Sequence, residues 1–228
     1  GFRRLANLIF RQLGGLSFSD IDESGRLLVM WRVLREASPF LRLYNNVDDK
    51  GGSFAELMLE TVTELKQFSV TPSMLERAGN VLSETHKELS DKLFDISFIY
   101  GTFQAFLTKE YNDPTDELTR VAEIVEGSGF FKDTNVYFDA FDGFTPQQYA
   151  VIDNIIEQAD NVTFSLCFDP SDESGLFGTT VKTYKQLYKK AERFSKKTEE
   201  LFLGESKSFK YDDIAYVSKN LWNHNVSS

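Results

Sequence analysis

Apolar residues recur every three or four positions through the first 125 residues of the chain, which is the spacing of one buried helix face. The pattern predicts helices over about 2–13, 22–43, 53–68, 83–111 and 113–125, and a short helix that starts at Pro72. The helix starts carry side-chain caps, two of them followed by proline: Asp20 or Asp22, Thr71-Pro72 and Asp113-Pro114. Gly14-Gly15 ends the first helix. No strand is predicted before residue 135.

The pattern changes after residue 135. The β-rich runs VYFDAF (136–141) and VTFSLCF (162–168) are joined by a helix that Thr145, Pro146 and Gln148 start as a capping box. A strand, a helix and a second strand in this order predict parallel pairing. A helix over about 178–196, a third strand over 198–203, a short strand near 208–211 and a last helix are expected to follow.

We therefore expect a helix-rich α/β fold with a mainly helical region over 1–134 and a partial parallel α/β region over 135–228. A parallel sheet of about three strands is an incomplete domain, and the chain begins without Met inside a helical pattern. We expect a piece of a longer protein.

Composition supports a folded, globular protein, with 41% hydrophobic and 26% charged residues. The single cysteine, Cys167, lies in an apolar run and is predicted to be buried in a strand. The sequence contains no signal peptide and no apolar run of about 18 residues, so we predict no membrane segment and a cytoplasmic location.

The net charge of −10 is unevenly distributed along the chain. Residues 48–160 carry 22 acidic and 8 basic residues, whereas residues 182–197 carry 7 basic residues and one acid. One helix face there collects candidate contacts to a phosphate backbone: Lys182, Lys185, Lys189 and Arg193, with Tyr184 and Tyr188 between them. The alternative is an ordinary solvated face with both tyrosines turned toward the core.

A strand that ends in Asp139 is a candidate for holding Mg²⁺ in a nucleotide-hydrolysing domain. Asp169 follows the next strand and should lie at the same edge of the sheet. Ala140 stands where such sites commonly have a glutamate that activates water. Gln148 could be a nucleotide ligand, but its place in the capping box explains it equally well.

Several segments, in this order, resemble the B subunit of the bacterial AddAB (RexAB) helicase–nuclease. The most specific are ELKQFSVTP, FDGFTPQQ and the block LFGTTVKTYKQL, and the resemblance covers essentially the whole chain. It implies a near-N-terminal piece that combines an inserted helical domain with part of a superfamily 1 helicase-like motor domain. It also implies an AddA/RexA-type partner subunit, action on double-stranded DNA ends, and scanning of single strands for a recombination hotspot.

Active superfamily 1 helicases carry D-E-F-Q-D-T-N-x-x-Q where this chain reads D-A-F-D-G-F-T-P-Q-Q. Asp139, Phe141 and Gln148 match, whereas Ala140 replaces the glutamate. In the next helicase pattern, G-D-x-x-Q, Asp169 matches and Asp172 replaces the glutamine. Loss of a general base costs about 10²–10⁴ in rate, so we predict a degenerate metal and nucleotide motif without catalytic residues.

No phosphate-binding loop of the form G-x-x-x-x-G-K-[ST] occurs in this sequence, so no cofactor or metal is expected in this piece. The resemblance leaves ATP and Mg²⁺ open for the whole protein, and an iron–sulfur cluster for its C-terminal part. The first hypothesis is a non-motor, helicase-like segment that lines a DNA channel and contacts the partner subunit. Two alternatives remain: an acidic helical adaptor with no nucleic-acid role, and a true nucleoside-triphosphatase that uses Asp139, Asp142 or Asp169.

Overall fold

The structure is a computed structural model of the 228-residue chain. It describes residues 1–15, 20–46, 52–168, 175–203 and 211–220. Within these ranges the chain is a helix-rich α/β protein with a small parallel sheet. This agrees with the fold class that the hydrophobic pattern predicts.

The part before the sheet is helical, as predicted. Its elements are α1 (Phe2–Leu13), α2 (Glu23–Ala37), η1 (Ser38–Phe40), α3 (Gly52–Gln67), α4 (Pro72–Leu82), α5 (Lys87–Glu110), η3 (Pro114–Asp116) and α6 (Glu117–Val125). Three predicted caps are confirmed, because Asp22, Thr71 and Asp113 each accept a hydrogen bond from a backbone N–H in the first turn that follows.

The sheet consists of β1 (Asn135–Phe138) and β2 (Asn161–Phe164), which pair in parallel with Phe138 opposite Phe164. They are joined by α7 (Pro146–Gln158) and followed by α8 (Gly178–Arg193) and α9 (Asp212–Asn220). Phe138 packs into the core, whereas Tyr137 on the opposite face is 73% exposed. The predicted β-α-β unit is confirmed.

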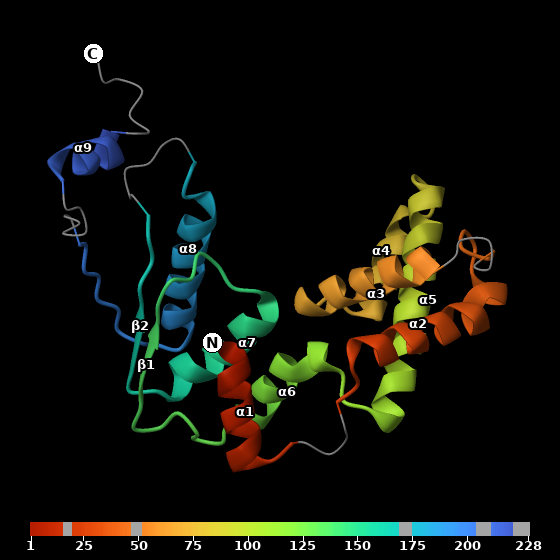
Figure 1. Cartoon of the computed structure of the whole chain (residues 1–228), viewed down its shortest axis with the longest axis horizontal. Coiled ribbons are helices and arrows are strands. Elements are labelled where there is room, and N and C mark those ends of the chain that lie inside the picture. The colour runs from red at the N-terminus through yellow and green to blue at the C-terminus, as the bar shows by residue number, and fades with distance from the viewer. Residues whose placement is uncertain (16–19, 47–51, 169–174, 204–210, 221–228) are drawn as a thin grey trace.

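Two clusters of buried apolar side chains hold the fold together. The first joins α2, α3, α4 and α5 around residues such as Met30, Val62 and Phe103. The second joins α1, α6 and α7 to the sheet and α8, around Ile9, Val121 and Ile152. Figure 1 shows the two groups of elements at opposite ends of the molecule. We call them the helical lobe and the sheet lobe; the predicted division at residue 134 stays a prediction.

The two lobes are connected where the segment before α2 meets the segment after α5. The backbone N–H of Ile21 donates to the carbonyl oxygen of Asn112 at 3.2 Å, next to a parallel bridge between Asp20 and Asn112. The chain therefore crosses between the lobes twice, at two segments that are hydrogen-bonded to each other.

Three details of the sequence prediction are wrong. The second helix ends at Ala37 rather than near residue 43, because Pro39 cannot continue it and a 3₁₀ turn follows. Residues 198–203 form no strand and pair with no strand in the described chain; Leu201 and Leu203 are exposed. Cys167 lies beyond the end of β2 and is exposed rather than buried.

Residues 204–210 lie outside the described residues, and with them most of the short strand predicted near 208–211. The last predicted helix is confirmed as α9. None of the helices in the described ranges has both the length and the apolar character that a membrane crossing requires.

Candidate functional site

Asp139 lies at the carboxyl end of β1, as the sequence pattern predicts. Its side chain is exposed, and its Oδ1 atom accepts a hydrogen bond from the Ser165 hydroxyl. The backbone N–H of Ser165 donates to the carbonyl oxygen of Phe138 at 2.8 Å, so the residue after β2 is fixed beside the end of β1. The sequence alone does not identify Ser165, because its contact depends on strand register rather than on a motif.

Ala140 adopts a left-handed backbone conformation with φ of 60°. This conformation costs an L-residue roughly 1–2 kcal/mol, and glycine is the residue that adopts it without strain. The chain turns sharply directly after Asp139. The Ala140 methyl group can neither accept a proton nor bind a metal ion, so the position next to Asp139 contributes no catalytic group.

Gln148 takes part in the predicted capping box at the start of α7. Its Oε1 atom accepts from the backbone N–H of Thr145 at 2.9 Å, and its own backbone N–H donates to Thr145 Oγ1 at 3.3 Å. The neighbouring Gln147 is buried and donates to Thr115 and Thr119, which ties α7 to the start of α6. Both glutamines have structural partners.

A magnesium site cannot be built from the described residues alone. Asp169 and Asp172 lie outside them, so the expected meeting of Asp139 and Asp169 at one sheet edge stays a prediction. Among the residues that the structure describes, no three His, Cys, Asp or Glu side chains are grouped so that they could hold a metal ion. The side chain beside Asp139 is a serine hydroxyl.

Helix α8 is anchored to the sheet lobe by one of its faces. Thr180, Thr183 and Leu187 are buried on this face, and Thr183 Oγ1 donates to the carbonyl oxygen of Asp142 at 2.9 Å. Lys190 Nζ lies 2.7 Å and 2.9 Å from the two carboxylate oxygens of Asp153 on α7. The anchor therefore joins α8 both to the loop after β1 and to α7.

The opposite face of α8 presents the predicted basic residues to solvent. Lys182, Lys185 and Lys189 are exposed and have no ion-pair partner among the described residues. Arg193 continues the row, is 72% exposed and lies 3.9 Å from Asp153. The four residues follow at spacings of three and four, so they share one helix face about 16 Å long.

The two tyrosines of α8 lie at the side of this basic face. Tyr188 is 39% exposed, and the Tyr184 ring lies 5.5 Å from the ring of Phe168. The Tyr184 hydroxyl donates to Glu200, and this hydrogen bond, with a smaller effect of burial, raises the pKa of Tyr184. Thr183 and Leu187 form the buried side, so the two tyrosines do not both turn to the core. The alternative of an ordinary solvated face for the basic residues stays a prediction.

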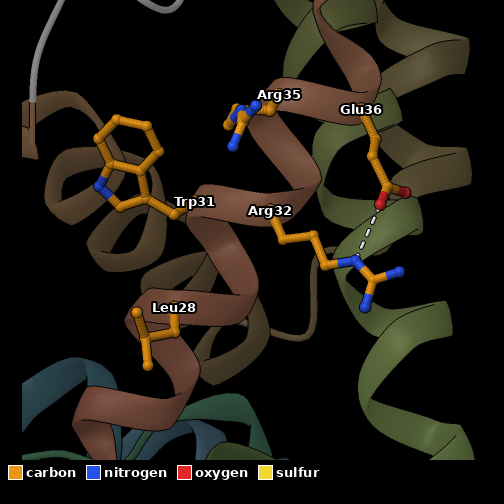
Figure 2. Close-up of a pocket in the computed structure, with 5 residues that line it drawn as sticks. All are labelled: Leu28, Trp31, Arg32, Arg35 and Glu36. Atoms are coloured by element: carbon orange, nitrogen blue, oxygen red, sulfur yellow. Dashed lines mark hydrogen bonds and ion pairs between the residues drawn. The ribbon is translucent and has the colours of Figure 1, made fainter.

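A shallow hollow of about 670 Å³ lies along α2 in the helical lobe, away from these residues. Figure 2 shows Arg32 and Glu36 extending to one side of α2, where an ion pair of 2.8 Å joins them, and Leu28 and Trp31 to the other. Arg35 also lines the hollow. None of these residues is predicted as a site residue from the sequence.

The chain is similar over nearly its whole length to one protein family. A family model described as "ADDB, N-terminal" matches residues 1–217. The ATP-dependent helicase/deoxyribonuclease B subunit of Caldanaerobacter subterraneus subsp. tengcongensis is 35% identical over 231 residues, which cover 98% of this chain and 20% of the relative.

Other relatives carry the same description. The corresponding protein of Thermoanaerobacter sp. is 33% identical over 232 residues, covering 98% of this chain and 20% of the relative. That of Clostridioides difficile is 35% identical over 192 residues, covering 82% of this chain and 16% of the relative. The chain thus spans about a fifth of the length of the curated relatives that it matches over most of its length.

Proposed function

Because the chain belongs to the family described as ADDB, N-terminal, we propose that it forms a helicase-like, non-motor part of a helicase–deoxyribonuclease subunit that processes broken DNA ends. In this role it lines part of the DNA channel and contacts a partner subunit of the AddA/RexA type. Its sheet lobe is part of a motor-like domain, in which β1 and β2 belong to a larger parallel sheet. The helical lobe is a domain inserted in that motor-like domain.

The basic face of α8 carries this proposal. Lys182, Lys185 and Lys189 project from a helix that Lys190 and Thr183 hold against the sheet lobe, so the three charges have a fixed spacing. A chain of net charge −10 repels DNA as a whole, and a local row of exposed ammonium groups provides the attraction that a phosphate backbone requires.

The residues around Asp139 support the non-motor character. Ala140 supplies no base, and the side-chain oxygen of Gln148 is held by the backbone of Thr145. ATP and Mg²⁺ would serve the whole protein through other residues, and an iron–sulfur cluster would belong to its C-terminal part.

Steady-state ATP hydrolysis by the intact two-subunit complex tests the proposal that this chain does not act as a motor. Asp139→Ala and Asp142→Ala, each made in this subunit, should leave turnover unchanged. Loss of turnover in either variant would favour the nucleoside-triphosphatase alternative.

DNA binding tests the proposal that the chain contacts DNA. It also distinguishes this proposal from the alternative of an acidic adaptor with no nucleic-acid role. Reversing the charges of Lys185 and Lys189 in the full-length protein should weaken its binding to duplex ends. A full-length protein that binds no DNA in any form would favour the adaptor.

A further inference from the structure

The two lobes, which lie at opposite ends of the molecule in Figure 1, meet through polar groups rather than through a shared apolar core. In the described chain the two apolar clusters have no residue in common. The contact joins α3 of the helical lobe to η3, the turn that leads into α6. Lys66 at the end of α3 lies 2.7 Å from Asp113 and 2.8 Å from Asp116. Each lobe therefore keeps its own core if this contact opens.

The turn η3 is attached to the sheet lobe. The side-chain amide of Gln147 on α7 donates to the carbonyl oxygen of Thr115 at 2.9 Å and to Thr119 Oγ1 at 3.1 Å. Gln147 is buried and Thr119 lies on α6, so η3, α6 and α7 form one unit. The ammonium group of Lys66 and the two carboxylates that it pairs with thus lie on opposite sides of the boundary between the lobes.

The backbone hydrogen bond from Ile21 to Asn112 provides a fixed point between the lobes. Arg26, in the first turn of α2, lies 3.3 Å from Asp113, and both residues are close in sequence to this hydrogen bond. Asp113 therefore has a second cation near the fixed point. Asp116 has a single ion-pair partner in the part of the chain that the structure describes, and its side chain is 30% exposed against 2% for Asp113. Asp116 is thus the carboxylate whose pairing can change.

Arg120 offers Asp116 a second partner. It lines a hollow of about 150 Å³ together with Lys66, Asp113 and Asp116. The Nε atom of Arg120 is buried without a hydrogen-bond partner, and Arg120 forms no ion pair within the described ranges. Asp116 and Arg120 are four positions apart at the start of α6 with the acid first, which is the favoured order for an ion pair along a helix. This second pair would lie wholly within the sheet lobe.

The charges around the hollow do not favour a bound anion. Two acids and two cations line it, so an added anion would face the carboxylates of Asp113 and Asp116. Glu117, another acid near Arg120, also has Arg3 beside it. An exchange of partners between groups already present therefore accounts for Arg120 without a ligand. We call Arg26, Lys66, Asp113, Asp116 and Arg120 the lobe joint.

We propose that the lobe joint is a two-position hinge in which Asp116 exchanges Lys66 for Arg120. In the docked arrangement, which the structure shows, Lys66 holds the lobes together. In the open arrangement Lys66 moves away with the helical lobe, and Asp116 pairs with Arg120. The new pair compensates Asp116 for part of the attraction that it loses. A binding partner selects one arrangement only if it binds that arrangement more tightly.

Single-molecule energy transfer in the full-length protein, without DNA, tests the hinge. Donor and acceptor dyes are attached to azide-bearing residues introduced at Lys92 on α5 and Glu157 on α7, two exposed positions in different lobes. The wild type should show one main transfer efficiency with rare excursions to a second. Lys66→Met should raise the ratio of open to docked molecules by about tenfold or more, because it removes the buried ion pair between the lobes.

Arg120 provides a readout that a purely structural role of Lys66 would not change. Lys66→Met/Arg120→Met should lower the ratio of open to docked molecules about twofold relative to Lys66→Met, because Asp116 then has no cation in the open arrangement. Lys66→Met/Arg120→Lys keeps the charge and should restore the ratio. The control is Lys66→Met/Arg11→Met, which removes an exposed arginine of the sheet lobe outside the joint and should behave as Lys66→Met does.

Two results would overturn the hinge. One is a single transfer efficiency in folded Lys66→Met molecules, equal to the main one of the wild type. The other is the same ratio of open to docked molecules in Lys66→Met/Arg120→Met and in the control with Arg11→Met.

If Lys66→Met does not fold, the wild type and Arg120→Met decide. Wild-type excursions that become rarer in Arg120→Met support the exchange. Wild-type molecules at one efficiency, or excursions that Arg120→Met leaves unchanged, overturn it. The inference goes beyond the proposed function and its measurement contains no DNA. Its failure therefore leaves the proposed function, which the α8 variants test, unaffected.

Discussion

Lys66 on α3 and Asp113, in the segment that leads to α6, form a buried ion pair with 2.7 Å between Nζ and Oδ2. Their side chains are 1% and 2% exposed. Lys66 also lies 2.8 Å from Asp116, and Arg26 of α2 lies 3.3 Å from the other oxygen of Asp113. The network lies at the junction of the two lobes, so it fixes the helical lobe relative to the sheet lobe.

The network alters the acid–base properties of the groups in it. Burial alone would raise the pKa of Asp113, but Lys66 and Arg26 outweigh this effect and lower it. Burial, with smaller effects of Asp116 and Asp113, raises the pKa of Tyr100 to about 12. Both shifts have the same physical origin, which is the burial of these groups beside the charges of the junction.

Removal of the Lys66 charge should destabilise the fold strongly. Lys66→Met keeps the length of the side chain but leaves two carboxylates at the junction without their ammonium partner, so the free energy of unfolding should fall by about 3 kcal/mol. Urea unfolding measures the change. Lys92→Met, at an exposed lysine of the same lobe, should change the free energy by no more than about 0.5 kcal/mol. Equal effects of the two substitutions would contradict a structural role for the pair.

The pH dependence of stability should report on Asp113. Because its pKa is lower in the folded chain than the unfolded value of about 3.9, its contribution is complete above that value and is lost as the pH falls through the lowered pKa. Asp113→Asn keeps the cap on Thr115 but removes the charge. The wild type should be more stable than this variant at pH 7, and the difference should shrink as the pH falls below about 3.9.

The control for the pH experiment is Asp160→Asn, at an exposed carboxylate of the turn before β2. Its difference from the wild type should stay small across the same pH range. A constant difference for Asp113→Asn, from pH 7 down to acid unfolding, would mean that the charge of Asp113 does not stabilise the fold.

Local signals in the sequence predicted the parts of the fold that depend on neighbouring residues. Thr71-Pro72, Asp113-Pro114 and the Thr145–Gln148 box start helices or turns in the structure because a cap needs only the next few residues. The parallel pairing of β1 with β2 also followed from one strand, one capped helix and a second strand.

Contacts between distant segments could not be predicted in this way. Lys66 and Asp113 are 47 positions apart, and nothing near either residue indicates its partner. The lysines of α8 look alike in the sequence, but Lys190 forms an ion pair with Asp153 whereas Lys185 and Lys189 are exposed. This difference arises from the packing of α8 against α7, which the sequence around the lysines does not indicate. The run over 198–203 has the composition of a strand, but strand formation requires a partner strand, and the described chain provides none.

The strained backbone at Ala140 should be relieved by glycine. Ala140→Gly removes a left-handed cost of roughly 1–2 kcal/mol and adds about 0.4–1 kcal/mol of unfolded-chain entropy, so it should stabilise the fold by about 0.5 kcal/mol. Ala105→Gly, at an exposed position inside α5, should destabilise it by about 1 kcal/mol. Thermal unfolding compares the stabilities of the two variants. If Ala140→Gly destabilises the fold as Ala105→Gly does, the result would argue against a left-handed conformation at Ala140.

The capping role of Gln148 can be separated from a nucleotide-binding role. Thr145→Ala and Gln148→Ala each remove half of the capping box, and each should lower stability by about 1 kcal/mol. ATP turnover by the full complex should not change in either variant. A turnover defect confined to Gln148→Ala, with stability as in the wild type, would point to nucleotide contact.

The central claim is that the outer face of α8 contacts DNA. The most direct measurement is the affinity of the full-length protein for a duplex end across a range of salt concentrations, for wild type and Lys185→Glu/Lys189→Glu. If both lysines contact phosphates, the slope of log affinity against log salt should fall by about two, since each contact contributes about 0.9. Lys132→Glu, an exposed charge reversal outside α8, serves as the control. A slope and affinity for the double variant equal to those of Lys132→Glu would contradict DNA contact through α8.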